Sequence, residues 1–211
     1  MSTGKIQVYY GAGRGKTSAA LGYAIHEASK GESVIVIQFL KRKDEDEISF
    51  LGRLEPEIRL FRFQKSEKYY NELPDEGQLE EQMNMKNGIN YARKVLQTGE
   101  CNILILDEVL GLLNEQIVSE EEIVQLMELK SDDMDLIMTG QIISDGIITH
   151  ADEVYEICIN ASKRKDRRNP SVNYNKYVKS LYKNTNRRLT ILFQSVILST
   201  NKTLTDRGCV D

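Results

Sequence analysis

The sequence between residues 10 and 18 is Tyr10-Gly11-Ala12-Gly13-Arg14-Gly15-Lys16-Thr17-Ser18. The apolar run Ile6 to Tyr10 before it predicts a strand, and residues Lys16 to Lys30 after it predict a helix that Gly31 ends. Glycines let the backbone bend so that successive N–H groups face one anion, and a helix N-terminus adds partial positive charge. A turn of this kind between a strand and a helix therefore predicts a phosphate-binding loop. The alternative is a glycine-rich turn that binds nothing.

The predicted loop offers two kinds of contact to a nucleotide. Lys16 can reach the terminal phosphates, and the Thr17 hydroxyl can bind a Mg²⁺ ion held by them. The general pattern G-x-x-x-x-G-K-[ST] has glycine where this chain has Tyr10. The residues predicted to bind the nucleotide are Gly11, Ala12, Gly13, Arg14, Gly15, Lys16, Thr17 and Ser18.

Two adjacent carboxylates follow a second apolar run, in the stretch Leu104-Ile105-Leu106-Asp107-Glu108. A buried parallel strand ends at the edge of the sheet where ligands bind. We therefore predict that Asp107 holds the Mg²⁺ ion, directly or through water, and that Glu108 orients a ligand or positions a solvent molecule. The alternative is that the two acids only cap the following segment.

The rest of the chain alternates short apolar runs with helical patterns, which is typical of a parallel sheet built from βαβ units. The sequence thus predicts an α/β fold of the P-loop NTPase-like (RecA-like) kind, with a mostly parallel sheet and helices on both faces. A capping box at Ser119 and Glu122 predicts one helix start, and Gly99 predicts the end of a helix whose apolar face includes Met85 and Leu96. Further strands are predicted at residues 33–40, 58–63, 102–109, 136–139 and 154–159.

The net charge of −4 conceals an acidic body and a basic C-terminal end. Residues 162–211 carry 12 Lys and Arg against three Asp, a balance of +9, whereas the preceding 161 residues carry −13. We predict a P-loop α/β domain over residues 1–161 and a basic extension over residues 162–211. The extension interleaves cations with tyrosines, a mixture that can bind nucleic acid. No nucleic-acid-binding module accompanies it, so we favour a solvated extension that docks on the acidic body.

Composition excludes several other classes of protein. The longest apolar runs fall far below the roughly 18 residues that a membrane span needs. The N-terminus has no basic start followed by an apolar run, which argues against a secretory signal. The cysteines, Cys101, Cys158 and Cys209, are odd in number and far apart, so neither a disulfide framework nor a zinc cluster is expected. These features predict a cytoplasmic protein.

Several stretches together resemble one family. The phosphate loop with the helix start after it, Val36 to Lys41, Leu106 to Glu108, Thr139-Gly140 and Ala151 to Glu156 occur in the order found in corrinoid adenosyltransferases of the ATP:cob(I)alamin type. The resemblance extends over residues 5–157. That family also lacks the first glycine of the general phosphate loop. Its most discriminating piece is Gln38-Phe39-Leu40-Lys41, because other P-loop proteins need no such stretch there.

The resemblance implies an enzyme that transfers the 5′-deoxyadenosyl group of ATP to the cobalt of a reduced corrinoid and releases triphosphate. It implies Mg²⁺, a corrinoid substrate of the cob(I)alamin or cobyrinate type, a flavoprotein reductant and a homodimer. Thr17 and Asp107 would hold the metal. Tyr69, Tyr70 and Phe63 could shield a corrin face where the family has Trp. The residues implied to bind substrate are Phe39, Lys41, Glu108 and Gln141.

The chain also departs from the family pattern. It has Gln141 and His26 where the family has Arg, it contains no Trp, and the closing Lys-His-Pro and Gly-Ile-Glu elements do not appear after residue 157. Two alternatives therefore stay open: a regulatory or nucleic-acid-binding P-loop NTPase, and a relative that binds ATP or corrinoid without turnover. We interpret His26 as a surface or packing residue and His150 as a loop residue. The methionines Met83, Met85, Met127 and Met134 are predicted to fill the core.

Overall fold

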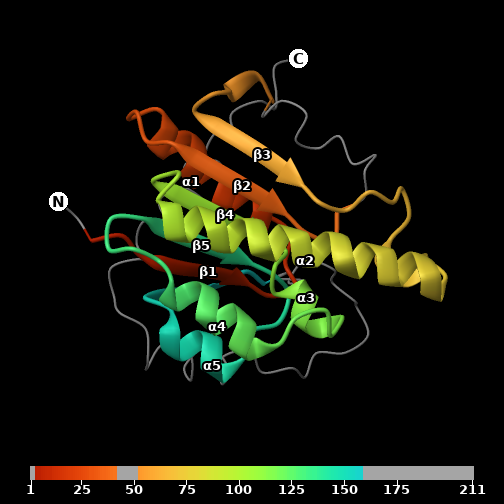
Figure 1. Cartoon of the computed structure of the whole chain (residues 1–211). Helices are drawn as coiled ribbons and strands as arrows, with labels where there is room; N and C mark the ends of the chain where they lie inside the picture. The colour runs from red at the N-terminus through yellow and green to blue at the C-terminus, as the bar shows by residue number, and fades with distance from the viewer. Residues whose placement is uncertain (1–2, 42–51, 159–211) are drawn as a thin grey trace, which may run out of the picture. The chain divides into compact units, whose positions relative to one another are not determined.

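The computed structural model describes residues 3–41 and 52–158. These residues form a six-stranded sheet of order β3-β2-β4-β5-β1-β6 (Figure 1), and every pair of neighbouring strands is parallel. The predicted α/β P-loop fold is confirmed. The strands are β1 (Ile6–Tyr10), β2 (Val34–Gln38), β3 (Ile58–Arg62), β4 (Ile103–Asp107), β5 (Asp135–Thr139) and β6 (Glu153–Glu156).

Helices cover both faces of the sheet, as the uninterrupted apolar runs of β2 and β4 require. On one face, Ile35, Ile37 and Leu104 pack with residues of α2, α4 and α5. These helices lie in front of the sheet in Figure 1. Val36 and Ile105 pack on the other face, with residues of α1. Because successive side chains of a strand point to opposite faces, one strand supplies two cores. The helices are α1 (Lys16–Ala28), α2 (Asp75–Thr98), α3 (Gly111–Asn114), α4 (Glu120–Glu128) and α5 (Asp145–His150), with a 3₁₀ turn η2 (Tyr70–Glu72).

Helix α2 is much longer than the strands that it covers. It has 24 residues and is about 36 Å long, whereas a five-residue strand spans about 17 Å. Its N-terminal half extends past the carboxyl ends of the strands (Figure 1). Met83 lies in this half and is 56% exposed, so its predicted core position is wrong. The other three methionines of that prediction, Met85, Met127 and Met134, are buried as expected.

The predicted boundaries hold within a few residues. The first helix ends at Ala28 rather than Lys30, and β2 ends at Gln38 rather than at residue 40. The capping box at Ser119 opens α4 as predicted, with Glu122 N donating to the Ser119 hydroxyl at 3.2 Å. His150 is the last residue of α5 rather than a loop residue. The basic extension over residues 162–211 and Ile159, the last residue of the strand predicted at 154–159, lie outside the described residues.

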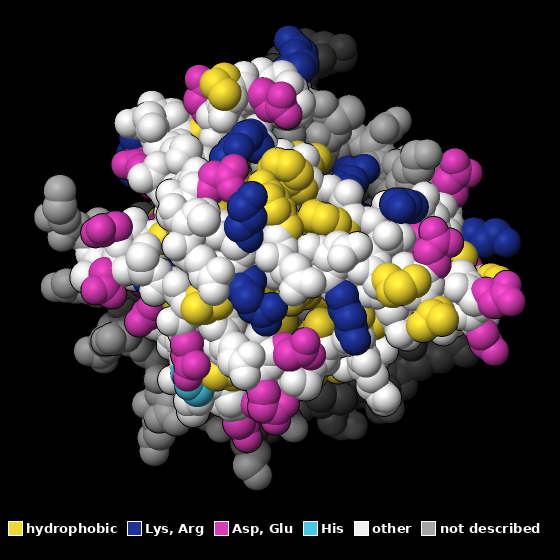
Figure 2. Space-filling view, viewed as in Figure 1, with side chains coloured by type: hydrophobic (Ala, Val, Ile, Leu, Met, Phe, Trp, Pro, Cys, Tyr) yellow, Lys and Arg dark blue, Asp and Glu magenta, His cyan; other side chains and the backbone are white. Residues whose placement is uncertain are grey.

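The surface of the described domain mixes the two signs of charge. Figure 2 shows Lys and Arg side chains interspersed with Asp and Glu on the face covered by α2 and α4, with apolar side chains between them. This face therefore presents no continuous basic stripe. No helix among residues 3–41 and 52–158 is long and apolar enough to cross a membrane.

Candidate functional site

The predicted phosphate loop joins β1 to α1 at the carboxyl edge of the sheet. All eight residues predicted to bind the nucleotide lie in this loop or in the first turn of α1. Gly11 and Gly15 have φ angles of 114° and 110°, in the region that favours glycine. The sequence thus places glycine where the chain must turn sharply between the strand and the helix.

The loop is held against the segment that follows β6. Gly13 N donates to the Ile157 carbonyl oxygen at 2.7 Å, and Ile157 N donates to the Tyr10 carbonyl oxygen at 2.7 Å. A Cβ atom on Gly13 would lie 2.5 Å from that same Ile157 oxygen. The loop therefore has no room for a side chain at residue 13. Sequence reasoning missed the contribution of Ile157, because a backbone contact leaves no sequence motif.

The Lys16 side chain curls over the loop. Its Nζ atom donates to the carbonyl oxygens of Gly11 at 2.7 Å and Gly13 at 3.0 Å. The ammonium group is therefore held at the loop by two neutral acceptors, which do not neutralise its charge. This arrangement keeps a cation where the loop can receive an anion.

Asp107 is the centre of a buried hydrogen-bond network at the end of β4. Its side chain is 1% exposed. Its Oδ1 atom accepts hydrogen bonds from the Thr17 and Thr139 hydroxyls, each at 2.8 Å, and its Oδ2 atom accepts one from Gln38 Nε2 at 3.0 Å. The structure thus brings together the two predicted metal-binding residues, Thr17 and Asp107, from segments 90 residues apart.

The donor set at Thr17 and Asp107 fits Mg²⁺. A hydroxyl and a carboxylate are hard oxygen ligands, and Mg²⁺ keeps several waters and binds phosphate oxygens beside one or two protein ligands. Among the described residues no three His, Cys, Asp or Glu side chains form a metal cluster. Two oxygen ligands beside a phosphate loop match a metal that arrives with a nucleotide better than a resident metal held by the protein alone.

Glu108 follows Asp107 in an unusual conformation. Its φ angle is 61°, and its backbone N–H donates to the Thr139 hydroxyl oxygen at 2.8 Å. Burial raises the pKa of its carboxyl group, the neighbouring Asp107 raises it further, and Lys41 and Lys16 oppose the shift. A non-glycine residue held in the left-handed region costs free energy, and such residues gather at functional sites. Leu40, two residues after the end of the neighbouring strand β2, has a φ angle of 52° and shares this feature.

A cavity of about 620 Å³ opens beside the phosphate loop. Three of the four residues predicted to bind substrate, Lys41, Glu108 and Gln141, line it together with Arg14. The structure does not bring Phe39 there, because that side chain is fully buried in the core. The other residues that line the cavity are Leu40, Tyr69, Tyr70, Asn71, Gly111, Asn114 and Glu115.

The aromatic wall of this cavity differs in part from the prediction. Tyr69 and Tyr70 line it, and the Tyr70 hydroxyl accepts a hydrogen bond from Gln82 Nε2 at 2.7 Å. Phe63 does not line it and packs near Tyr91 instead, with their ring centroids 6.0 Å apart. Sequence reasoning missed Asn71, Asn114 and Glu115, which stand in loops or short helices without a recognisable motif.

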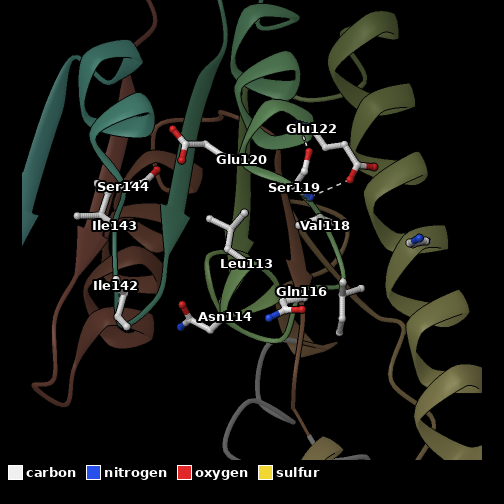
Figure 3. A pocket seen from close by; sticks show the side chains of 12 residues that line it. Leu113, Asn114, Gln116, Val118, Ser119, Glu120, Glu122, Ile142, Ile143 and Ser144 are labelled. Atoms are coloured by element: carbon white, nitrogen blue, oxygen red, sulfur yellow. Dashed lines mark hydrogen bonds between the residues drawn. The ribbon is translucent and has the colours of Figure 1, made fainter. Parts of the chain in front are cut away.

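A second cavity of about 630 Å³ lies next to the first and shares Asn114 with it. Figure 3 shows Ile142 and Ile143 on the segment between β5 and α5, and Leu113 and Val118 on the segment around α3. No sequence motif pointed to this cavity.

Comparison with known proteins places these features in context. The model of the family ATP:corrinoid adenosyltransferase BtuR/CobO/CobP matches residues 2–168. An uncharacterized protein of Nostoc sp. (strain PCC 7120) is 29% identical over 152 residues, which cover 66% of this chain and 39% of the relative. The chain thus spans about two-fifths of the length of that relative. A KaiC-like protein of Pyrococcus horikoshii OT3 has 18% sequence identity and a TM-score of 0.48, with 72% of this chain and 70% of that chain covered.

Proposed function

Because the chain belongs to the ATP:corrinoid adenosyltransferase family, we propose that it transfers the 5′-deoxyadenosyl group of ATP to the cobalt of a reduced corrinoid. The observation that carries the proposal is the convergence of Lys16, Thr17 and Asp107 beside the cavity that Lys41, Glu108 and Gln141 line. A phosphate loop next to a separate cavity of about 620 Å³ suits a reaction between a nucleotide and another substrate.

The proposed reaction makes few demands on protein side chains. The Co(I) centre of the corrinoid substrate supplies the electron pair, a bond from cobalt to C5′ of ATP forms, and the bond from C5′ to the triphosphate oxygen breaks. Triphosphate leaves with the electrons of the broken bond. The protein therefore needs neither a covalent nucleophile nor a general base, and its contribution is positioning and charge stabilisation.

The residues of the loop would stabilise the charge that builds up on triphosphate. Lys16 and Arg14 supply cations, and the N-terminus of α1 adds its partial positive charge. Thr17 and Asp107 would hold Mg²⁺, which neutralises phosphate charge when it is bound. A leaving group that gains negative charge in the transition state is bound more tightly there than in the ground state, which accelerates the reaction.

The cavity beside the loop would receive the corrinoid. Tyr69 and Tyr70 provide aromatic surface for the ring, while Lys41 and Gln141 provide polar groups for its substituents. Glu108 adds a carboxyl group whose pKa is raised by burial. We further propose a homodimer in the cytoplasm that receives its reduced corrinoid from a flavoprotein.

One experiment tests the reaction directly. The full chain is incubated with ATP, Mg²⁺ and chemically reduced cobalamin, and the cobalt–carbon absorption spectrum and the release of triphosphate are recorded. We expect both products in equal amounts, and a large loss of both for Lys16→Ala. Release of ADP and phosphate without a cobalt–carbon bond would instead identify an NTPase. Binding of ATP or corrinoid without either product would identify a non-catalytic relative.

A further inference from the structure

A row of polar side chains crosses the carboxyl edge of the sheet from its outer strand to the phosphate loop. Gln38 on β2 is the register partner of Arg62 on β3 and of Asp107 on β4. Register partners in a parallel sheet place their side chains on the same face. Arg62 Nε donates to Gln38 Oε1 at 2.8 Å, and Gln38 Nε2 donates to Asp107 Oδ2 at 3.0 Å. The two hydrogen bonds run in one direction and end on the carboxylate beside Thr17.

The chemistry of the three groups allows only this direction. A guanidinium can only donate hydrogen bonds and an ionised carboxylate can only accept them, whereas a glutamine amide has one end of each kind. Arg62 therefore holds the carbonyl end of the Gln38 amide, which leaves the NH₂ end for Asp107. An amide turned by 180° would direct two donors at each other and two acceptors at each other. Gln38 and Asp107 are each 1% exposed, so water is not at hand to repair such a mismatch.

We propose that Arg62 and Gln38 are positioning residues for the Mg²⁺-nucleotide site, and this rests on the proposed function. By binding Oδ2, Gln38 fixes the rotation of the Asp107 carboxylate about its own axis. In this fixed orientation the Asp107 Oδ1 atom is directed at the Thr17 hydroxyl. Arg62 acts one step further away, because it fixes the orientation of Gln38. Gln38, which sequence analysis singled out without a role, thereby gains one.

A second arginine on the same strand provides the matched control. Arg59 lies at the other end of β3, where its guanidinium donates to Glu100 Oε1 at 3.0 Å and pairs with that carboxylate. The two arginines share a strand, an edge position and a residue type. They lie on opposite faces of β3, and of the two only Arg62 is connected through Gln38 to Asp107.

The test measures ATP binding to the full chain by calorimetry, with and without Mg²⁺. The quantity compared is the gain in ATP affinity that Mg²⁺ brings. We expect Arg62→Leu to reduce this gain by about threefold to tenfold, as for the loss of one hydrogen bond, and to leave the affinity in EDTA unchanged. Arg62→Lys, which can still donate to Gln38, should retain part of the gain, and Arg59→Leu should retain all of it. A defect in stability alone would weaken binding equally with and without Mg²⁺.

A double substitution tests whether Arg62 acts through Gln38. If it does, Arg62→Leu combined with Gln38→Met should lose no more of the Mg²⁺-dependent gain than Gln38→Met alone, because coupled residues are non-additive. The inference would be overturned if Arg62→Leu and Arg59→Leu showed equal Mg²⁺-dependent gains in ATP affinity, or if the losses added up in the double variant. ATP binding by the unaltered chain would in that case still support the proposed function. If Arg62→Leu does not fold, the comparison of Arg62→Lys with Arg59→Lys decides in the same way. Absence of ATP binding by the unaltered chain would overturn both.

Discussion

Replacing Glu81 with glutamine should destabilise the loop that forms the aromatic wall of the cavity. Glu81 lies on α2 and is 4% exposed. Its Oε1 atom accepts hydrogen bonds from Ser66 N at 2.7 Å and Lys65 N at 3.0 Å, and its Oε2 atom accepts one from Asn84 Nδ2 at 3.3 Å. The segment that it holds leads directly into Tyr69, one of the residues that line the cavity.

The magnitude follows from what glutamine can still do. Its amide oxygen can take the place of Oε1 and accept from both backbone donors, but without charge assistance. Hydrogen bonds to a charged group contribute about 1.5–3 kcal/mol, against about 1 kcal/mol for neutral ones, so each of the two loses about 1 kcal/mol. The new NH₂ group faces the Asn84 amide, which is itself a donor there. We therefore expect a loss of about 2–4 kcal/mol in the free energy of unfolding.

Urea unfolding followed by circular dichroism measures this loss. Glu80→Gln is the control, because Glu80 is the neighbouring residue on α2, has the same charge and is exposed. Surface substitutions away from specific contacts change stability by about 0.5 kcal/mol or less. Equal unfolding midpoints for the two variants would refute the reasoning, since they would show that the buried carboxylate contributes nothing beyond its surface neighbour.

Three further predictions concern the phosphate loop, Glu108 and the C-terminal extension. Gly13→Ala should weaken ATP binding because its Cβ would lie 2.5 Å from the Ile157 carbonyl oxygen, whereas Gly22→Ala, exposed in α1 with nothing within 4 Å, should leave binding unchanged and stabilise the protein by up to about 1 kcal/mol. Calorimetry and thermal unfolding of the two variants check this, and equal ATP affinities would contradict it. Burial raises the pKa of Glu108, so protonation of this carboxyl group favours the folded state. This contribution to stability is fully present below the ordinary pKa of glutamate and is lost as the pH rises through the raised value. The Tm of Glu108→Gln relative to the unaltered chain should therefore increase with pH across that window, and a difference that does not change with pH would contradict it. Removal of residues 162–211 should leave the Mg²⁺-ATP affinity unchanged, because the nucleotide site described here lies entirely before residue 158; calorimetry of the truncated, folded chain checks this, and a loss of ATP binding would place the extension in that site.

The parts of the fold that sequence analysis predicted depend on local patterns. The run Ile103 to Leu106 alternates between the two cores of the sheet, so an uninterrupted apolar run identified a strand buried on both faces. The phosphate loop was predictable because glycines and Gly-Lys-Thr occur together within nine residues. The core prediction for Met83 is wrong because this residue lies off the buried face of α2, whereas Glu81, Asn84 and Met85 at the same level of the helix lie on that face.

The parts that sequence analysis missed depend on which strands are neighbours. No local pattern shows that β3 and β4 flank β2, so the connection from Arg62 through Gln38 to Asp107 became visible only with the order of the sheet. The same holds for Ile157, whose carbonyl oxygen meets Gly13 across the loop. Left-handed conformations at Leu40 and Glu108 also escape prediction, because neither residue type favours them.

The four residues of the stretch Gln38-Phe39-Leu40-Lys41 have different physical roles. Gln38 ends β2 and belongs to the polar row at Asp107, whereas Phe39 turns into the core, where a Cβ on Gly88 would lie 2.7 Å from its ring. Leu40 then takes a left-handed conformation, after which Lys41 lines the cavity. The buried ring fixes the end of the strand, and the left-handed residue redirects the chain toward the ligand side. A requirement for substrate contact explains only Leu40 and Lys41, which both line the cavity. The requirement that the chain leave a buried strand and reach the cavity within three residues explains the whole stretch.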